Sequence, residues 1–127
     1  MSEPNLVNVS SIYGRSFLEL LKDDAIDHSN ASMLGGAVAT NKLIKINSII
    51  VASIDGANAT VIDVAVNHHD HGRHYIAKNV DLPAKSTLIV IGKDSPIYLE
   101  EGDELEARAS TDSDADICIS YELLDDA

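Results

Sequence analysis

The most regular feature of the chain is a run of β-branched residues from Ile44 to Ile54 that ends in the turn Asp55-Gly56. Every even position in this run is apolar or small, and this spacing places side chains on one face of a strand. Ile49 and Val51 make the opposite face apolar as well. The pattern predicts a strand whose even face packs on a core, and it predicts that Ile49 and Val51 contact another subunit.

Turn signals divide the rest of the chain into short apolar runs. They are Asp55-Gly56, His71-Gly72, Leu82-Pro83, Gly92-Lys93-Asp94, Glu101-Gly102-Asp103 and Thr111-Asp112-Ser113-Asp114. Between them apolar and polar residues alternate, with Leu105, Ala107, Ile117 and Ile119 as the expected inward positions. Short strands at this spacing are typical of sandwiches and barrels. We therefore expect an all-β fold, with an antiparallel β-sandwich or jelly-roll-like domain of seven or more strands over residues 41–127.

The first forty residues have a different pattern, and we expect them to form an N-terminal arm followed by a loop. Residues 17–26 contain an apolar run too short to distinguish a helix from a strand followed by a turn. Such an arm often packs on a neighbouring subunit. The residues expected to make this contact are Leu6, Val7, Val9, Ile12 and Tyr13.

Length and cysteine content fit one soluble domain. A chain of 127 residues is long enough to bury a core without covalent cross-links. The single cysteine, Cys118, allows no internal disulfide, and nothing near it in sequence would activate its thiol. No basic segment followed by an apolar stretch is present, so secretion is not expected.

The charge of the chain argues against two classes of partner. Nine Lys and Arg residues oppose 21 Asp and Glu residues, giving a net charge of −12. This charge repels phosphate backbones and anionic lipid surfaces, so we expect neither nucleic acid nor membrane as a partner. Tryptophan is absent and the four tyrosines are scattered, which disfavours stacking on bases or sugars.

Four of the five histidines lie in one segment, residues 67–74. Imidazole and carboxylate groups bind zinc, nickel and iron, so the segment contains candidate metal ligands. These candidates are His68, His69, Asp70, His71 and His74. A simpler interpretation is a solvated hairpin turn in which Gly72 adopts a positive φ. We favour the turn and predict neither a metal nor another cofactor, although three copies of this loop around a symmetry axis could chelate an ion.

Two short motifs resemble the cupin barrels. His69-x-His71 is similar to the metal-binding pair of that family, and residues 100–103 are similar to its strand-linking turns. Cupins also place a glutamate shortly after the histidines, whereas residues 72–80 contain no acid. The ligand set is thus incomplete. A cupin-like metal-dependent enzyme is an alternative, but no catalytic residue is predicted because no phosphate loop or nucleophile motif is present.

Several motifs taken together resemble a family of small virion proteins of tailed phages, common in marine and cyanobacterial phages. The motifs are Asn5-Leu-Val-Asn-Val-Ser, Ile12-Tyr-Gly, Lys45-Ile-Asn-Ser-Ile-Ile-Val-Ala, Asp55-Gly-Ala-Asn-Ala, Leu82-Pro-Ala and Ile97-Tyr-Leu-Glu-Glu-Gly-Asp. The resemblance spans most of residues 5–122. The histidine-rich hairpin and residues 17–27 depart from the family.

The resemblance implies a virion structural protein, made in the host cytoplasm, that acts without catalysis. Within that class we expect a capsid decoration or cement protein that forms a homotrimer and lays its N-terminal arm on the major capsid protein. The alternative within the same class is that the chain is itself a neck, tail or fibre-base component of the virion. Its partners are the major capsid protein or other virion proteins. A receptor- or glycan-binding module is a further alternative that the sandwich fold would also suit.

Overall fold

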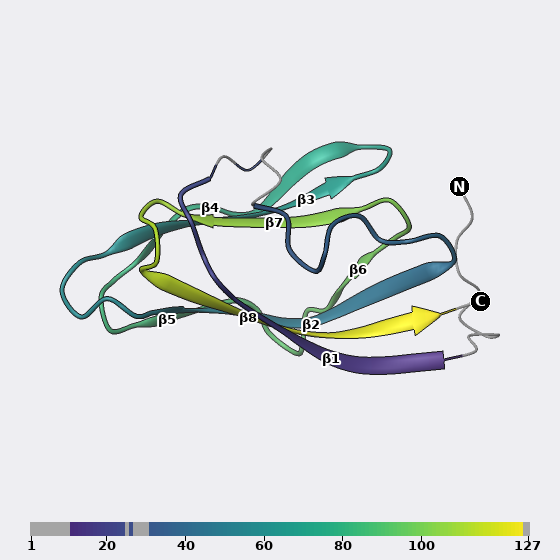
Figure 1. Cartoon of the computed structure of the whole chain (residues 1–127), viewed down its shortest axis with the longest axis horizontal. Helices are drawn as coiled ribbons and strands as arrows, with labels where there is room; N and C mark the ends of the chain where they lie inside the picture. Colours follow the sequence, from purple (N-terminus) through teal and green to yellow (C-terminus); the bar gives the residue numbers. More distant parts are fainter. Residues whose placement is uncertain (1–10, 25, 27–30, 126–127) are drawn as a thin grey trace.

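The computed structural model describes residues 11–24, 26 and 31–125. The described residues form eight strands and no α-helix. The strands are β1 (Ser11–Leu20), β2 (Lys42–Ser53), β3 (Thr60–His68), β4 (Gly72–Leu82), β5 (Thr87–Ile91), β6 (Ile97–Leu99), β7 (Glu104–Ala109) and β8 (Ala115–Asp125). Figure 1 shows that they lie in two layers.

The two layers are antiparallel sheets. In the large sheet the order is β1-β8-β2-β5, and β6 pairs with β2 on the same side as β5. In the small sheet the order is β4-β3-β7. The prediction of an all-β antiparallel sandwich is therefore confirmed.

The inner faces of both sheets form one hydrophobic core, as sandwich architecture requires. Its fully buried side chains come from strands of each layer. They include Ile46, Ile49, Val51, Ile117 and Ile119 of the large sheet and Ile62, Val64, Leu105 and Ala107 of the small sheet. The expected inward positions on β7 and β8 are thus confirmed. Burial of this apolar set stabilises the fold.

The prediction that Ile49 and Val51 contact another subunit is wrong. A β-bulge between Ile46 and Ser48 shifts the pairing of β2 with β8 by one residue. An extra residue in one strand moves every later side chain to the opposite face. Even-numbered residues therefore face the core before the bulge, and odd-numbered residues face it afterwards. Ile49 and Val51 have relative exposures of 0%, so their side chains cannot contact another subunit.

The expected boundary at residue 40 does not separate an arm from the sandwich. Strand β1 is paired with β8 along its whole length, from Ser11 opposite Asp125 to Leu20 opposite Asp116. Residues 17–20 thus belong to a strand rather than to a helix. Leu6, Val7 and Val9 of the expected contact lie outside the described residues.

The segment after β1 crosses from the large sheet to the edge of β7 that does not pair with β3 (Figure 1). Its backbone binds that edge at several points, since Met33 donates to the Leu105 carbonyl at 2.7 Å and Ala109 donates to the Lys22 carbonyl at 3.2 Å. Covering an edge strand prevents it from pairing with another chain. No helix in the described part of the chain is long and apolar enough to cross a membrane.

Candidate functional site at the histidine turn

The histidines lie where the β3–β4 turn meets the β6–β7 turn. β3 ends at His68 and β4 begins at Gly72, whose φ of +76° confirms the positive φ expected there. Gly102 has a φ of +89° in the second turn. Only glycine adopts this backbone conformation without steric cost, so each glycine sets the sharp reversal that brings the two turns together.

A buried carboxylate, Asp103, joins the two turns. Its side chain has a relative exposure of 1%. Oδ1 accepts hydrogen bonds from the backbone N–H of His69 at 2.9 Å and from Nδ1 of the same residue at 2.7 Å. Oδ2 accepts a hydrogen bond from the backbone N–H of Glu100 at 2.8 Å. A buried charge is tolerated when it is hydrogen-bonded in this way.

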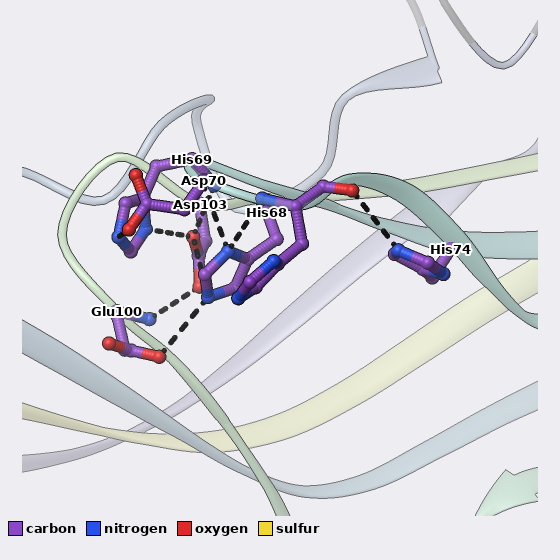
Figure 2. Close-up of polar contacts among 7 residues, drawn as sticks. His68, His69, Asp70, His74, Glu100 and Asp103 are labelled. Atoms are coloured by element: carbon purple, nitrogen blue, oxygen red, sulfur yellow. Dashed lines mark hydrogen bonds and ion pairs between the residues drawn. The ribbon is translucent and has the colours of Figure 1, made fainter.

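The His68 ring is fixed by contacts on both of its nitrogens (Figure 2). Nδ1 accepts hydrogen bonds from the backbone N–H groups of Asp70 and His71, at 3.1 and 3.2 Å. Since Nδ1 accepts, the proton of the neutral ring belongs on Nε2, which donates to Oε2 of Glu100 at 3.3 Å. The ring also stacks between those of His69 and His71, with centroid distances of 4.2 and 4.8 Å.

His69 is held between two carboxylates. Its Nδ1 faces Asp103, and its Nε2 lies 3.1 Å from Oδ2 of Asp70. The hydrogen bond to Asp103 is the largest cause that raises the pKa of His69, and the charge of Asp70 acts in the same direction. Burial alone would raise the pKa of Asp103, but hydrogen bonds from His69 and Glu100 outweigh it and lower that pKa. The geometry thus favours an imidazolium paired with buried carboxylate.

The structure brings together some of the predicted metal ligands and separates others. His68, His69 and Asp70 belong to the cluster, whereas His71 contributes a stacked ring and a backbone N–H but no ligand atom of its side chain. His74 bonds to the His71 carbonyl oxygen at 3.1 Å and lies apart from the cluster (Figure 2).

Sequence reasoning missed the two acids Glu100 and Asp103 as members of the site. They come from a turn some thirty residues away, and their sequence signal was the Glu-Gly-Asp of residues 101–103, which predicted only the turn. The ligand atoms that lie together are those of His68, His69 and Asp103, so His71 of the cupin-like pair is not among them.

The cluster has the donor types that a metal would need. Ligand atoms of His68, His69 and Asp103 lie within 4.8 Å of one another. Binding a divalent ion would require His69 to release the proton that it shares with Asp103, because only a neutral imidazole nitrogen can coordinate. Both nitrogens of each ring already have partners within the protein. The hydrogen bonds of His68, His69, Glu100 and Asp103 therefore join the two turns without a metal. We call this group of residues the latch.

The remaining predicted contact residues lie at the start of β1. Ile12 and Tyr13 have relative exposures of 63% and 45%. Both side chains are accessible to a partner, on opposite faces of the strand.

Comparison with known proteins does not identify the chain. No protein-family model matches it, and a search of curated proteins found no significant match.

Proposed function

We propose that the protein is a structural component of a tailed-phage virion, and within the virion a capsid decoration or cement protein. It acts by self-association and by contact with other virion proteins, without catalysis. The motif resemblance over residues 5–122 supports the class of protein. A compact sandwich with an acidic surface suits an outer shell, because like-charged particles repel one another and stay dispersed.

The main structural support for this proposal is the edge of strand β1, which is unpaired among the described strands. β1 pairs with β8 on one side, and no other described strand pairs with it on the other. Most of its ten residues are exposed, including the large apolar side chains of Ile12 and Leu18. A long, exposed and partly apolar edge offers backbone hydrogen bonds to an added strand. β1 is thus an edge that can receive a strand of a partner protein, whereas the edge of β7 is covered.

The first test asks whether the chain is in the particle. Mass spectrometry of gradient-purified particles of the phage that encodes this sequence should detect the chain at a copy number that scales with the shell. Absence of the chain from intact particles would contradict the proposal.

The second test asks whether the N-terminal region makes the contact. The full chain should bind particles that lack it, whereas a variant without residues 2–12 should lose binding. Ile12→Glu should weaken binding, and Tyr75→Glu, with the same charge change on the exposed surface of β4, serves as the matched control. Undiminished binding by a folded deletion variant would rule out the arm as the attachment.

A metal-dependent role is the second candidate, and the grouping of His68, His69 and Asp103 within 4.8 Å supports it. Native mass spectrometry after incubation with zinc or nickel tests this role directly. One ion per chain, lost in His68→Ala and kept in His74→Ala, would favour it over the purely structural role. A metal-free spectrum at micromolar ion would favour the latch.

A further inference from the structure

An apolar row crosses the outer face of the large sheet. Leu18 pairs with Cys118, Cys118 with Ile50, and Ile50 with Ile89, so four strands place one apolar side chain each on a single line. All four point away from the core, because their neighbours in each strand are the inward residues. Leu18 and Ile89 have relative exposures of 72% and 65%.

Few charges surround this row. The adjacent row on one side consists of Ser16, Ser120 and Ser48. The row on the other side contains Leu20, Asp116, Ala52 and Thr87, in which Asp116 is the only charged residue. These three rows thus contain one charged side chain, in a chain with a net charge of −12. Such a patch marks an interaction surface.

We propose that this outer face packs against the same face of a second copy, about a two-fold axis that runs parallel to the strands between β8 and β2. This inference rests on the self-association in the proposed function and names the surface responsible. The axis places β8 of one copy over β2 of its partner, and β1 over β5 and β6. Aligned sheets pack face to face in this manner in sandwiches.

The face is self-complementary in shape under this axis. The large side chain of Ile50 lies opposite the small side chain of Cys118 in the partner. Both residues belong to a groove that is lined mainly by apolar side chains, and the two acids Glu19 and Asp116 line it as well. Tyr98, half exposed on β6, lies in the row of Lys45, Glu122 and Gly14. The axis places Tyr98 opposite Gly14 of the partner, where an added Cβ would meet nothing within 4 Å.

The face is also self-complementary in charge. Lys45 on β2 and Glu122 on β8 are register partners on this face, and their side chains lie 3.9 Å apart. The two-fold axis passes between their strands, so Lys45 of one copy lies opposite Glu122 of the other. Charges of opposite sign then meet twice across the contact, which favours a second copy over an acidic partner of another kind.

Native mass spectrometry of the full chain at micromolar concentration tests the contact. We expect a dimer. Leu18→Glu and Ile89→Glu should each raise its dissociation constant by at least about tenfold, because each buries a charge in an apolar contact. Both positions are exposed in the single chain, so the variants should keep the wild-type circular dichroism spectrum. Tyr75→Glu, on the small sheet, should leave the dissociation constant unchanged.

The single cysteine gives an independent readout. Cys118 lies in the middle of the contact, so its alkylation by N-ethylmaleimide should slow as the protein concentration rises above the dissociation constant. In Leu18→Glu the alkylation rate should not depend on concentration. An oligomer whose Cys118 reacts at a concentration-independent rate would place the contact elsewhere and overturn the proposal.

The mass of the oligomer separates the possible failures. A homotrimer would overturn this two-fold contact, since three copies require a head-to-tail interface, and would leave the self-association in the proposed function standing. A monomer at all concentrations would overturn both the contact and that self-association. A dimer that is absent from purified virions would support the contact and contradict the virion role.

Discussion

At the scale of single residues, Asp103 connects two turns that are far apart in the chain. One buried carboxylate accepts three hydrogen bonds and so ties the β3–β4 turn to the β6–β7 turn. The adjacent backbone extends the connection to a third segment, because Val38 donates to the Asp103 carbonyl oxygen at 3.0 Å. Removing an acceptor of this kind leaves several donors unsatisfied in a buried place.

Asp103→Ala should lower the free energy of unfolding by about 2–4 kcal/mol, because three hydrogen bonds to a buried charged group are lost. The measurement is urea denaturation followed by circular dichroism. Asp70→Ala is the matched control, since that carboxylate belongs to the same cluster but is largely exposed. An equal effect of both variants would contradict the latch.

The His69–Asp103 pair should make stability depend on pH in two directions. Because the pKa of His69 is raised, its protonated ring contributes fully to the free energy of unfolding below about pH 6.5. This contribution is lost as the pH rises through the pKa of the folded state. Because the pKa of Asp103 is lowered, its carboxylate contributes to the free energy of unfolding above about pH 3.8. This contribution is lost as the pH falls through the pKa of the folded state. The pair therefore contributes most between about pH 4 and 6.5.

Thermal unfolding at pH values from 4 to 9 checks this dependence. His69→Gln should remove the part of the loss that occurs above about pH 6.5, because glutamine does not titrate. His74→Gln is the control, since His74 makes no contact with a carboxylate in the cluster. A wild-type profile that His69→Gln leaves unchanged would show that the pair does not couple to folding.

At the scale of elements, the bulge in β2 determines which residues form the core and which form the surface. It turns Ile49 and Val51 inward and leaves Ile50 on the outer face. The same bulge therefore completes the inner core and supplies one member of the apolar row. A strand without the bulge would place these two sets on the wrong sides.

Val51→Glu should destabilise the chain by at least about 4 kcal/mol, or prevent folding, because it places a carboxylate in a core without a partner for it. Ile54→Glu is the control, since Ile54 follows the same strand with about half of its surface exposed. Its effect should stay within about 0.5 kcal/mol. Chemical denaturation compares the two, and a folded, stable Val51→Glu monomer would contradict the inward placement of Val51.

At the scale of the whole molecule, charge and apolar surface act against each other in association. Each chain has a net charge of −12, so two chains repel at long range. The apolar row on the large sheet provides the short-range attraction, which salt does not screen. The dissociation constant of the oligomer therefore depends on how strongly dissolved salt screens this repulsion.

Self-association should strengthen as sodium chloride rises from about 20 to 300 mM, because the Debye length shortens from roughly 20 Å to under 8 Å. Sedimentation equilibrium at fixed pH measures the dissociation constant across this range. Leu18→Glu should associate weakly at every salt concentration. It lacks the apolar contact that holds two copies together once salt has weakened the charge repulsion. Dissociation of the wild-type oligomer by salt would show that ion pairs hold it together instead.

The sequence alone determined the fold class and most of the strand positions. Alternation along β7 and β8 identified inward residues such as Leu105 and Ile117, because a period of two is a local property of extended backbone. Turn residues such as Gly72 were also predictable, since a positive φ depends on the residue itself. The excess of acidic residues likewise follows from the sequence alone.

Only the tertiary structure decided which faces are buried and which distant groups meet. The bulge in β2 is a feature of its pairing with β8, so the sequence could not show that Val51 faces inward. Asp103 reaches His69 because two turns far apart in the chain are adjacent in the sandwich. The apolar row exists because the register aligns Leu18, Cys118, Ile50 and Ile89 across four strands. Long-range pairing sets all three features, and it is not encoded in any local pattern.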